Sequence, residues 1–246
     1  MGQLRHKQSK SRWNCSTALV ACVAMNGMAK TFKPKLEILP AEQRRLWDAL
    51  GQVPEGMVLY GGTALALQLG HRLSVDFDFF TNKPIDTEEL LKLPMLEGCE
   101  VLMVDENSLT ANTKGPEAVK MSFFSVPDIG KTDEPLIAEG TKLRVAPLLD
   151  LAATKVKVIQ DRAEPKDYID LYELIAGGYV TLEGALDAAV KIYGDDFHVG
   201  GSLLALQHYE EGKLPELDIK VRERLTDEAQ ALSRTMRERQ RKGRKK

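Results

Sequence analysis

The sequence YGGTALALQLGHRLSVDFDFF, residues 60–80, carries the strongest structural pattern in this chain. An apolar strand predicted over residues 57–60 is broken by two glycines, Gly61 and Gly62. A strand that ends in two glycines and opens a helix exposes several backbone N–H groups at one point, where a phosphate can approach closely. Taken alone, the glycine pair is also compatible with an ordinary tight turn between a strand and a helix.

The same stretch continues with a short helix and a second strand. Thr63 is predicted to cap a helix over residues 64–69, and Gly70 ends that helix. A second strand is predicted over residues 73–80. Because only one short helix separates the two strands, the glycine pair and the second strand should meet at the same edge of a sheet.

Two aspartates alternate with two phenylalanines in the second strand. Residues two apart in a strand point to the same side, so Asp76 and Asp78 share one face while Phe77 and Phe79 fill the other. Adjacent carboxylates in an apolar strand repel each other unless a cation lies between them. Hard oxygen ligands suit Mg²⁺, as one ion or two, which would also bind substrate phosphates. The alternative is a strand end with two solvated acids, which the flanking phenylalanines disfavour.

Three polar residues lie between the glycine pair and the acids, namely His71, Arg72 and Ser74. Arg72 is a candidate for binding a phosphate, and Ser74 shares the predicted face of Asp76. Each of the three is equally well interpreted as a hydrogen-bonding residue that stabilises the loop.

The rest of the pattern separates a strand-rich part from a helical part. Short helices are predicted over residues 36–52 and from residue 87, and further strands over residues 99–104, 108–113, 118–126 and 142–146. Helices are then predicted over residues 147–162, 165–176, 181–193 and 202–210, and from about residue 226. We therefore expect an α+β protein, with a mixed-sheet lobe over residues 28–146, an α-helical lobe over residues 147–236 and a ligand cleft between them.

The sequence LLDLAATKVKVIQDRAEPKDYIDLYELI, residues 148–175, carries a second unusual pattern. At 100° per residue, Lys155 and Arg162 fall inside the apolar stripe of the first helix, whereas Asp150 falls on its solvent side. A lysine and an arginine on an inward face need an anionic partner.

The following helix places Asp167 and Asp170 on its apolar face. One interpretation is a buried ion-pair network that joins the two helices, with Arg162 beside Asp170. The other is functional: Lys155 reaches the phosphates of a nucleotide, and Asp167 lies near the cleft.

Residues 60–80 resemble the core motif of the polymerase-beta-like nucleotidyltransferase superfamily. The GHR and SVDFDFF segments are similar to the AbiEii/AbiGii toxin family in particular, and the similarity returns at residues 148–175. Members of that family are nucleotidyltransferase-like toxins of abortive-infection and toxin–antitoxin systems. The resemblance implies a nucleotidyltransferase-like N-terminal lobe, an NTP substrate and a separately encoded antitoxin protein as partner.

The residue patterns and the resemblance together give expected roles to particular residues. Nucleotide binding is expected at Gly61, Gly62, Thr63, Arg72 and Lys155, metal binding at Asp76 and Asp78, and catalysis at Asp76, Asp78, Lys155 and Asp167. The family's K…R…(R/K)D..DLY pattern falls on Lys155, Arg162, Lys166, Asp167 and Asp170. It implies a functional role for Lys155, which would bind the triphosphate, and for one of the aspartates.

The chain departs from the wider superfamily at a third metal-binding acid. Many members carry this acid on a later central strand, but the corresponding strand here, residues 119–125, has none. Either Asp167 or another acid supplies it, or the site works with two acids. A degenerate site that binds a nucleotide without turnover is a further alternative.

Charge is unevenly distributed along the 246 residues. The net charge is −2, but residues 1–27 carry +4 and the tail, residues 237–246, carries +6, so the body between them carries −12. Residues 1–27, a basic stretch before a short apolar run, are also compatible with a secretory signal. We favour a disordered or over-extended start, because a second methionine, Met28, follows at once. The apolar run within them is too short to span a bilayer, and with three scattered cysteines the chain fits a reducing cytoplasm without membrane association.

Together these features predict a Mg²⁺-dependent nucleotidyltransferase that moves a nucleoside monophosphate from an NTP to an acceptor. The acceptor is expected to be RNA, in particular a tRNA end, with the basic tail helping to hold it. The alternatives are a small-molecule nucleotidyltransferase that modifies an antibiotic-like hydroxyl, and a non-catalytic nucleotide-binding protein of the same fold.

Overall fold

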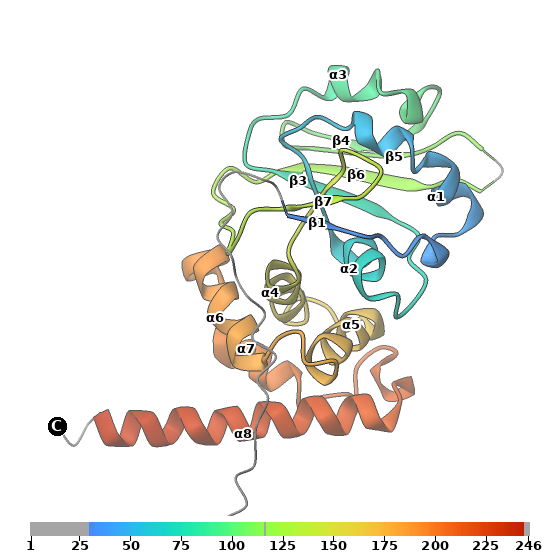
Figure 1. The fold of residues 1–246 in the computed structure, drawn as a ribbon. Helices are drawn as coiled ribbons and strands as arrows, with labels where there is room; N and C mark the ends of the chain where they lie inside the picture. Colours follow the sequence, from blue (N-terminus) through green and yellow to red (C-terminus); the bar gives the residue numbers. More distant parts are fainter. Residues whose placement is uncertain (1–29, 116, 244–246) are drawn as a thin grey trace, which may run out of the picture.

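The computed structural model describes residues 30–115 and 117–243, and residues 60–80 lie at the centre of its eight-stranded sheet. The strand order is β1-β7-β8-β2-β3-β6-β5-β4 (Figure 1). The strands are β1 (Thr31–Phe32), β2 (Val58–Tyr60), β3 (Phe77–Thr81), β4 (Glu100–Val104), β5 (Ser108–Asn112), β6 (Lys120–Ser125), β7 (Leu136–Ala138) and β8 (Arg144–Val145). Strand β3 pairs antiparallel with β2 and parallel with β6, so the predicted α+β class with a mixed sheet is confirmed.

Of the helices in the described part of the chain, three lie between strands and the last five follow the sheet. They are α1 (Ala41–Leu46), α2 (Gly61–Leu69), α3 (Thr87–Leu91), α4 (Leu148–Val158), α5 (Pro165–Ala176), α6 (Leu182–Tyr193), α7 (Val199–Ala205) and α8 (Ile219–Gly243). Helices α4 to α8 lie below the sheet in the view of Figure 1, whereas α3 lies above it. No helix in the described residues is long and apolar enough to cross a membrane.

The alternation in β3 separates two faces of the sheet. Phe77 and Phe79 are fully buried, and Phe79 stacks on Phe123 of β6 with ring centroids 5.2 Å apart. Asp78 and Phe80 are only partly buried because they point to the other face. The apolar half of the motif therefore forms core, which leaves the acid half free to line a site.

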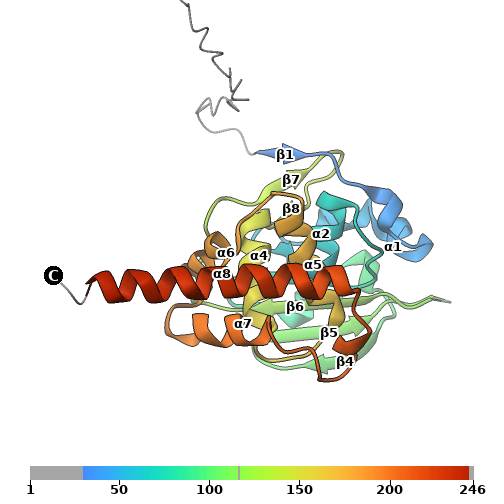
Figure 2. The same cartoon turned by 90° about the horizontal axis from the view of Figure 1, so that it is seen from below.

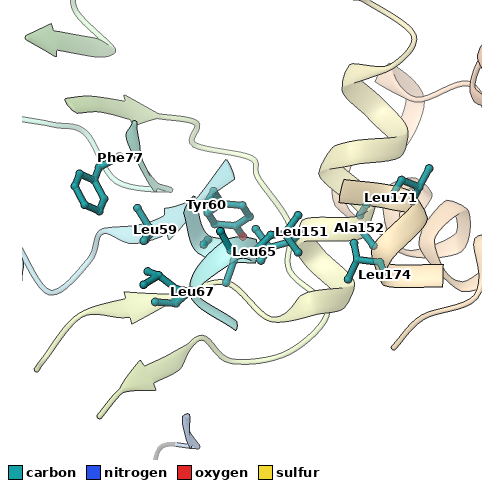
Figure 3. Packing of buried hydrophobic residues seen from close by; sticks show 14 of the residues in the cluster. Leu59, Tyr60, Leu65, Leu67, Phe77, Leu151, Ala152, Leu171 and Leu174 are labelled. Atoms are coloured by element: carbon teal, nitrogen blue, oxygen red, sulfur yellow. The ribbon is translucent and has the colours of Figure 1, made fainter. Parts of the chain in front are cut away.

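The core continues from the sheet into the helices. Leu65 of α2 packs between the sheet and Leu151 of α4, and Leu171 of α5 lies against the same layer near Ala152 (Figure 3). All four side chains are at most 1% exposed. Burial of a leucine side chain stabilises a fold by about 1.5–3 kcal/mol, so this contact fixes α4 and α5 against the sheet.

The secondary structure corrects several predicted boundaries. The segment predicted as one helix over residues 36–52 contains α1 between two 3₁₀ turns, and α8 begins earlier than expected. The helix predicted over residues 202–210 is α7 at residues 199–205. The two short strands β1 and β7 were not predicted. They pair with each other in parallel, and such short strands leave little periodicity in a sequence.

The start of the central motif also differs from the prediction. Helix α2 begins at Gly61 with Tyr60 at its N-cap, so the predicted capping role of Thr63 is wrong. Strand β3 begins at Phe77 and not at residue 73, because β2 ends at Tyr60 and gives the preceding segment no partner. Gly70 ends α2 with a left-handed φ of 70°, as predicted.

Helix α8 crosses the lower side of the molecule, and its C-terminal end projects beyond the other elements (Figures 1 and 2). It packs against α5, α6 and α7 through Val221, Leu225 and Ala229, which recur on one face. The first part of the predicted basic tail, residues 237–243, belongs to this helix. The rest of the tail and the predicted start, residues 1–27, lie outside the described residues.

Candidate active site

A cleft of about 630 Å³ opens where α2 begins, between the sheet and helices α4 and α5. It contains both parts of the central motif, since Gly61, Gly62, Asp76 and Asp78 all line it. The surrounding walls carry five cations, which are Arg72, Lys120, Lys155, Arg162 and Lys166. A small acidic centre among cations suits a ligand with several negative charges that also carries a metal ion.

The two glycines are required by close contacts. Gly61 has a φ of +74°, and a Cβ at this position would lie 2.8 Å from Oδ2 of Asp78. A Cβ at Gly62 would lie 2.4 Å from Nη2 of Arg72. The first turn of α2, the Asp78 carboxylate and the Arg72 guanidinium therefore meet at one point, where unpaired N–H groups favour an anion.

The acid pair lies directly beside this turn. Asp76 is partly exposed, with the Lys120 ammonium 3.3 Å from its carboxylate. Burial raises the pKa of Asp78, and the neighbouring carboxylate of Asp76 raises it further, while Lys120 and Ser122 oppose this effect. Two carboxylates that repel each other in this way fit a divalent cation, with phosphate and water as its further ligands.

The sheet register places a serine, and no acid, opposite Asp78. Asp78 pairs with Ser122 on β6, and Ser122 hydrogen-bonds to the Asp78 side chain. Asp167 lines the same cleft but is engaged by Lys155 and Arg162. In the part of the chain that the structure describes, no cluster of three or more His, Cys, Asp or Glu side chains could hold a metal.

Thr63 and Ser74 position the segment that precedes β3. The Thr63 hydroxyl lies 2.8 Å from Oγ of Ser74 and also donates to the backbone carbonyl of Asp76. Both side chains are buried. Thr63 therefore holds the acid-bearing segment against α2, while the backbone of Gly61 and Gly62 faces the cleft.

The loop residues His71 and Arg72 meet at Asp170 of α5. Arg72 donates from Nε and Nη2 to the two oxygens of Asp170 at 2.6 and 2.7 Å, and Nε2 of His71 lies 2.7 Å from Oδ1. Burial alone would raise the pKa of Asp170. The hydrogen bonds from His71 and Arg72, together with the charge of Lys155, hold it well below its usual range.

Lys155 links this cluster to the end of α4. Its ammonium lies 2.7 Å from both Asp167 and Asp170, and Arg162 donates to Asp167 at 2.8 Å. The expected ion-pair network between the two helices is thus present, but the predicted pairing of Arg162 with Asp170 is wrong. Arg162 follows the end of α4 and reaches only the first turn of α5, where Asp167 lies, while the loop from α2 occupies Asp170.

Asp150 also differs from its predicted position on the solvent side of α4. It is fully buried, and it accepts hydrogen bonds from the backbone N–H and hydroxyl of Thr132. Helical periodicity could not reveal this, because the covering loop comes from a distant part of the sequence. Lys120 and Ser122 were also missed, although their positions on alternate residues of one strand could have indicated them.

Several known proteins share this architecture. The nucleotidyltransferase toxin MenT4 of Mycobacterium tuberculosis is similar over 76% of this chain and 80% of its own, with 19% identity and a TM-score of 0.55. A putative nucleotidyltransferase of Helicobacter pylori is similar over 80% of this chain and 96% of its own, with 20% identity and a TM-score of 0.53. JHP933, also from Helicobacter pylori, gives a TM-score of 0.52 at 20% identity over 82% of this chain and 94% of its own.

A curated relative has a higher sequence identity to this chain than these three structures. The uncharacterized protein aq_aa25 of Aquifex aeolicus is 33% identical over 125 residues. The match covers 48% of this chain and spans only 56% of that relative.

The fold, together with the glycine turn, the cations and the acid pair in its cleft, defines a protein of the nucleotidyltransferase class. A family model described as the nucleotidyl transferase AbiEii toxin of type IV toxin–antitoxin systems matches residues 45–244. The chain therefore belongs to the AbiEii nucleotidyltransferase toxin family, and the resemblance seen in residues 60–80 and 148–175 is confirmed.

Proposed function

We propose that this protein transfers a nucleoside monophosphate from an NTP to an RNA acceptor, in particular a tRNA end. We also propose that it acts as the toxin of a system with a separately encoded antitoxin. One observation carries the proposal. The first turn of α2 and the acid pair both line the cleft and lie close together, since a Cβ added to Gly61 would lie 2.8 Å from Oδ2 of Asp78. A phosphate chain and its metal ion need these two groups side by side.

In this proposal the triphosphate lies against the first turn of α2. Backbone N–H groups of this turn and the Arg72 guanidinium would bind its oxygens, with Arg72 held in place by Asp170. Lys155 would contribute a further positive charge from α4. It lines the cleft, although its ammonium pairs with Asp167 and Asp170. Contact with a phosphate therefore requires Lys155 to shift partly away from these acids.

The carboxylates of Asp76 and Asp78 would hold Mg²⁺ and receive the proton of the acceptor hydroxyl. Mg²⁺, when bound, neutralises negative charge on the transferring phosphoryl group. The acceptor oxygen forms a bond to the α-phosphorus, and the bond from that phosphorus to pyrophosphate breaks. The hydroxyl proton moves to Asp76 or Asp78, and pyrophosphate leaves with its electron pair.

A labelling experiment tests this function. The protein is incubated with each radiolabelled NTP, Mg²⁺ and a cell extract, alongside Asp76→Asn and Asp78→Asn as inactive variants and Asp128→Asn as an exposed matched control. Label that is sensitive to RNase and absent with the first two variants is expected. Label that resists RNase but is lost with protease would overturn the RNA acceptor. Label confined to small molecules would instead favour modification of an antibiotic-like hydroxyl.

A further inference from the structure

A row of aromatic rings lies on the cleft face of the sheet, next to the acid pair. Tyr60 meets Phe80 edge to face with centroids 5.3 Å apart, and Phe80 meets Phe124 at 5.0 Å. Phe80 follows Asp78 by two residues on β3, and Phe124 follows Ser122 by two on β6. The rings therefore share the face of the acid pair, and both phenylalanines are half-buried in the wall of the cleft.

A second cavity begins on the far side of Phe80. Its volume is about 320 Å³, and Phe80 lines both this cavity and the cleft. Three cations also line it: Lys83, Lys131 and Arg144. Lys131 pairs with Glu134 at 2.6 Å, but Lys83 is exposed and makes no ion pair among the described residues. Two acids, Asp133 and Asp150, line the second cavity as well, so the row of rings leads from the acid pair to a wall of mixed charge.

The second cavity also contains buried polar atoms that lack partners. Asp150 lines it and is fully buried, yet its Oδ2 has no hydrogen-bond partner, and neither has Nε of Arg144. Unsatisfied buried groups are uncommon in folded proteins, so these two atoms distinguish the wall of the second cavity from ordinary core.

We propose that the cleft and the second cavity form one track for the single-stranded end of the acceptor RNA. The terminal nucleotide would place its hydroxyl at Asp76 and Asp78, and its base would stack on Phe80 and Phe124. The phosphate of the preceding nucleotide would lie near Lys83 and Arg144. Unpaired bases are required, because only splayed bases expose a face for stacking on aromatic side chains. This inference rests on the proposed RNA acceptor.

Stacking can be measured without catalysis. A short single-stranded RNA with 2-aminopurine at its 3′-terminal position is titrated with the full-length protein in the absence of NTP, because 2-aminopurine fluorescence is quenched when the base stacks. We expect quenching with the wild type. Phe80→Leu and Phe124→Leu should weaken RNA binding by about tenfold and remove the quenching. Phe124→Trp should retain both, which separates loss of stacking from loss of folding.

The end of the track at Lys83 is tested with a matched pair of variants. Lys83→Glu should weaken binding of the same RNA by several-fold and reduce its dependence on salt concentration. Lys213→Glu changes another exposed lysine elsewhere in the chain and should leave both the affinity and its salt dependence unchanged. Equal effects of the two variants would indicate a general charge effect and would overturn the placement of RNA phosphate in the second cavity.

Three other outcomes are informative. RNA that binds without quenching, or that binds the leucine variants as tightly as the wild type, would overturn the stacking site and leave the RNA acceptor intact. Quenching of a 2-aminopurine nucleoside triphosphate but not of the RNA would assign the rings to the incoming nucleotide. If the RNA does not bind, this inference fails. The labelling experiment then reports separately whether transfer to RNA occurs.

Discussion

Arg72 and Asp170 form a two-point ion pair although they lie 98 residues apart in the chain. Arg72 belongs to the loop after α2, and Asp170 belongs to α5. Asp170 is fully buried. Nε2 of His71 and the ammonium of Lys155 also lie 2.7 Å from its carboxylate. The pair therefore ties the loop after α2 to the helices that form the opposite wall of the cleft.

Breaking this pair should strongly destabilise the protein. Asp170→Ala leaves three cationic or polar groups without their buried acceptor, and removal of one partner of a buried ion pair lowers the free energy of unfolding by about 3–5 kcal/mol. Urea unfolding measures the difference. Asp161→Ala is the control, because Lys157 is the ion-pair partner of the exposed Asp161 among the described residues, and its loss should change stability by less than about 1 kcal/mol. A similar loss in both variants would contradict the role of the buried pair.

The same carboxylate predicts how stability responds to acid. The pKa of Asp170 is lowered in the folded protein, so its contribution to stability is present above the usual carboxyl pKa and is lost as pH falls below about 4. The free energy of unfolding should therefore drop in this range for the wild type. Asp170→Asn should show a smaller drop, measured by urea unfolding at a series of pH values. If the free energy of unfolding falls equally with pH in both proteins, the acid sensitivity does not come from Asp170.

Asp78 predicts a pH effect of opposite sign. Its pKa is raised in the metal-free protein, so ionisation of Asp78 is unfavourable, and this effect lowers stability as pH rises through the folded pKa. Asp78→Asn should raise the melting temperature of metal-free protein at neutral pH and remove any stabilisation by Mg²⁺ with NTP. Asp128→Asn, on an exposed loop, should do neither. A lower melting temperature for Asp78→Asn would show that the carboxylate has a structural partner instead.

The glycine pair allows steric contact to be separated from backbone strain. Gly61→Ala places a Cβ 2.8 Å from Asp78 and forces a positive φ, which together should abolish NTP binding and lower stability by about 1–2 kcal/mol or more. Gly140 also has a positive φ, +79°, but a Cβ added there would meet no atom within 4 Å. Gly140→Ala therefore introduces the backbone strain without the steric contact. It should lose stability and keep NTP affinity, as measured by calorimetry. Unaltered NTP affinity in Gly61→Ala would contradict the proposed placement of the phosphate at the first turn of α2.

The basic end of α8 should act on the acceptor and not on the nucleotide. Arg241→Gln together with Lys242→Gln is expected to raise the KM for RNA and to flatten its salt dependence, because fewer counterions are released from the RNA. NTP affinity should stay unchanged. The matched pair Lys92→Gln and Lys213→Gln removes the same charge elsewhere on the surface. A tail that serves only solubility would give identical KM values for both double variants.

The central motif could be predicted well from sequence because its signals are local. Alternation placed Phe77 and Phe79 in the core, and the spacing of Gly62 and Asp76 required one helix between two strands. The partners of Lys155 and Asp170 could not be predicted in this way. Which acid meets which cation depends on how α4, α5 and the loop after α2 pack, and a helical wheel contains no information on that packing.

The burial of Asp150 could not be predicted from helical periodicity either. Periodicity assigned it to solvent, but the segment around Thr132 covers that side of α4. Ser122 is a similar case, since its place opposite Asp78 follows from a parallel register between strands that lie far apart in the sequence. Long-range pairing of this kind leaves no local pattern.

Helix α8 has a practical consequence for biophysical work. Its 25 residues form a rod about 37 Å long, anchored by Val221, Leu225 and Ala229, and its C-terminal end stands clear of the other elements. A fluorophore or surface tether attached near Gly243 would thus sit on a rigid arm. It would hold every molecule on a sensor chip in one common orientation, with the cleft presented to the flowing ligand in the same way each time.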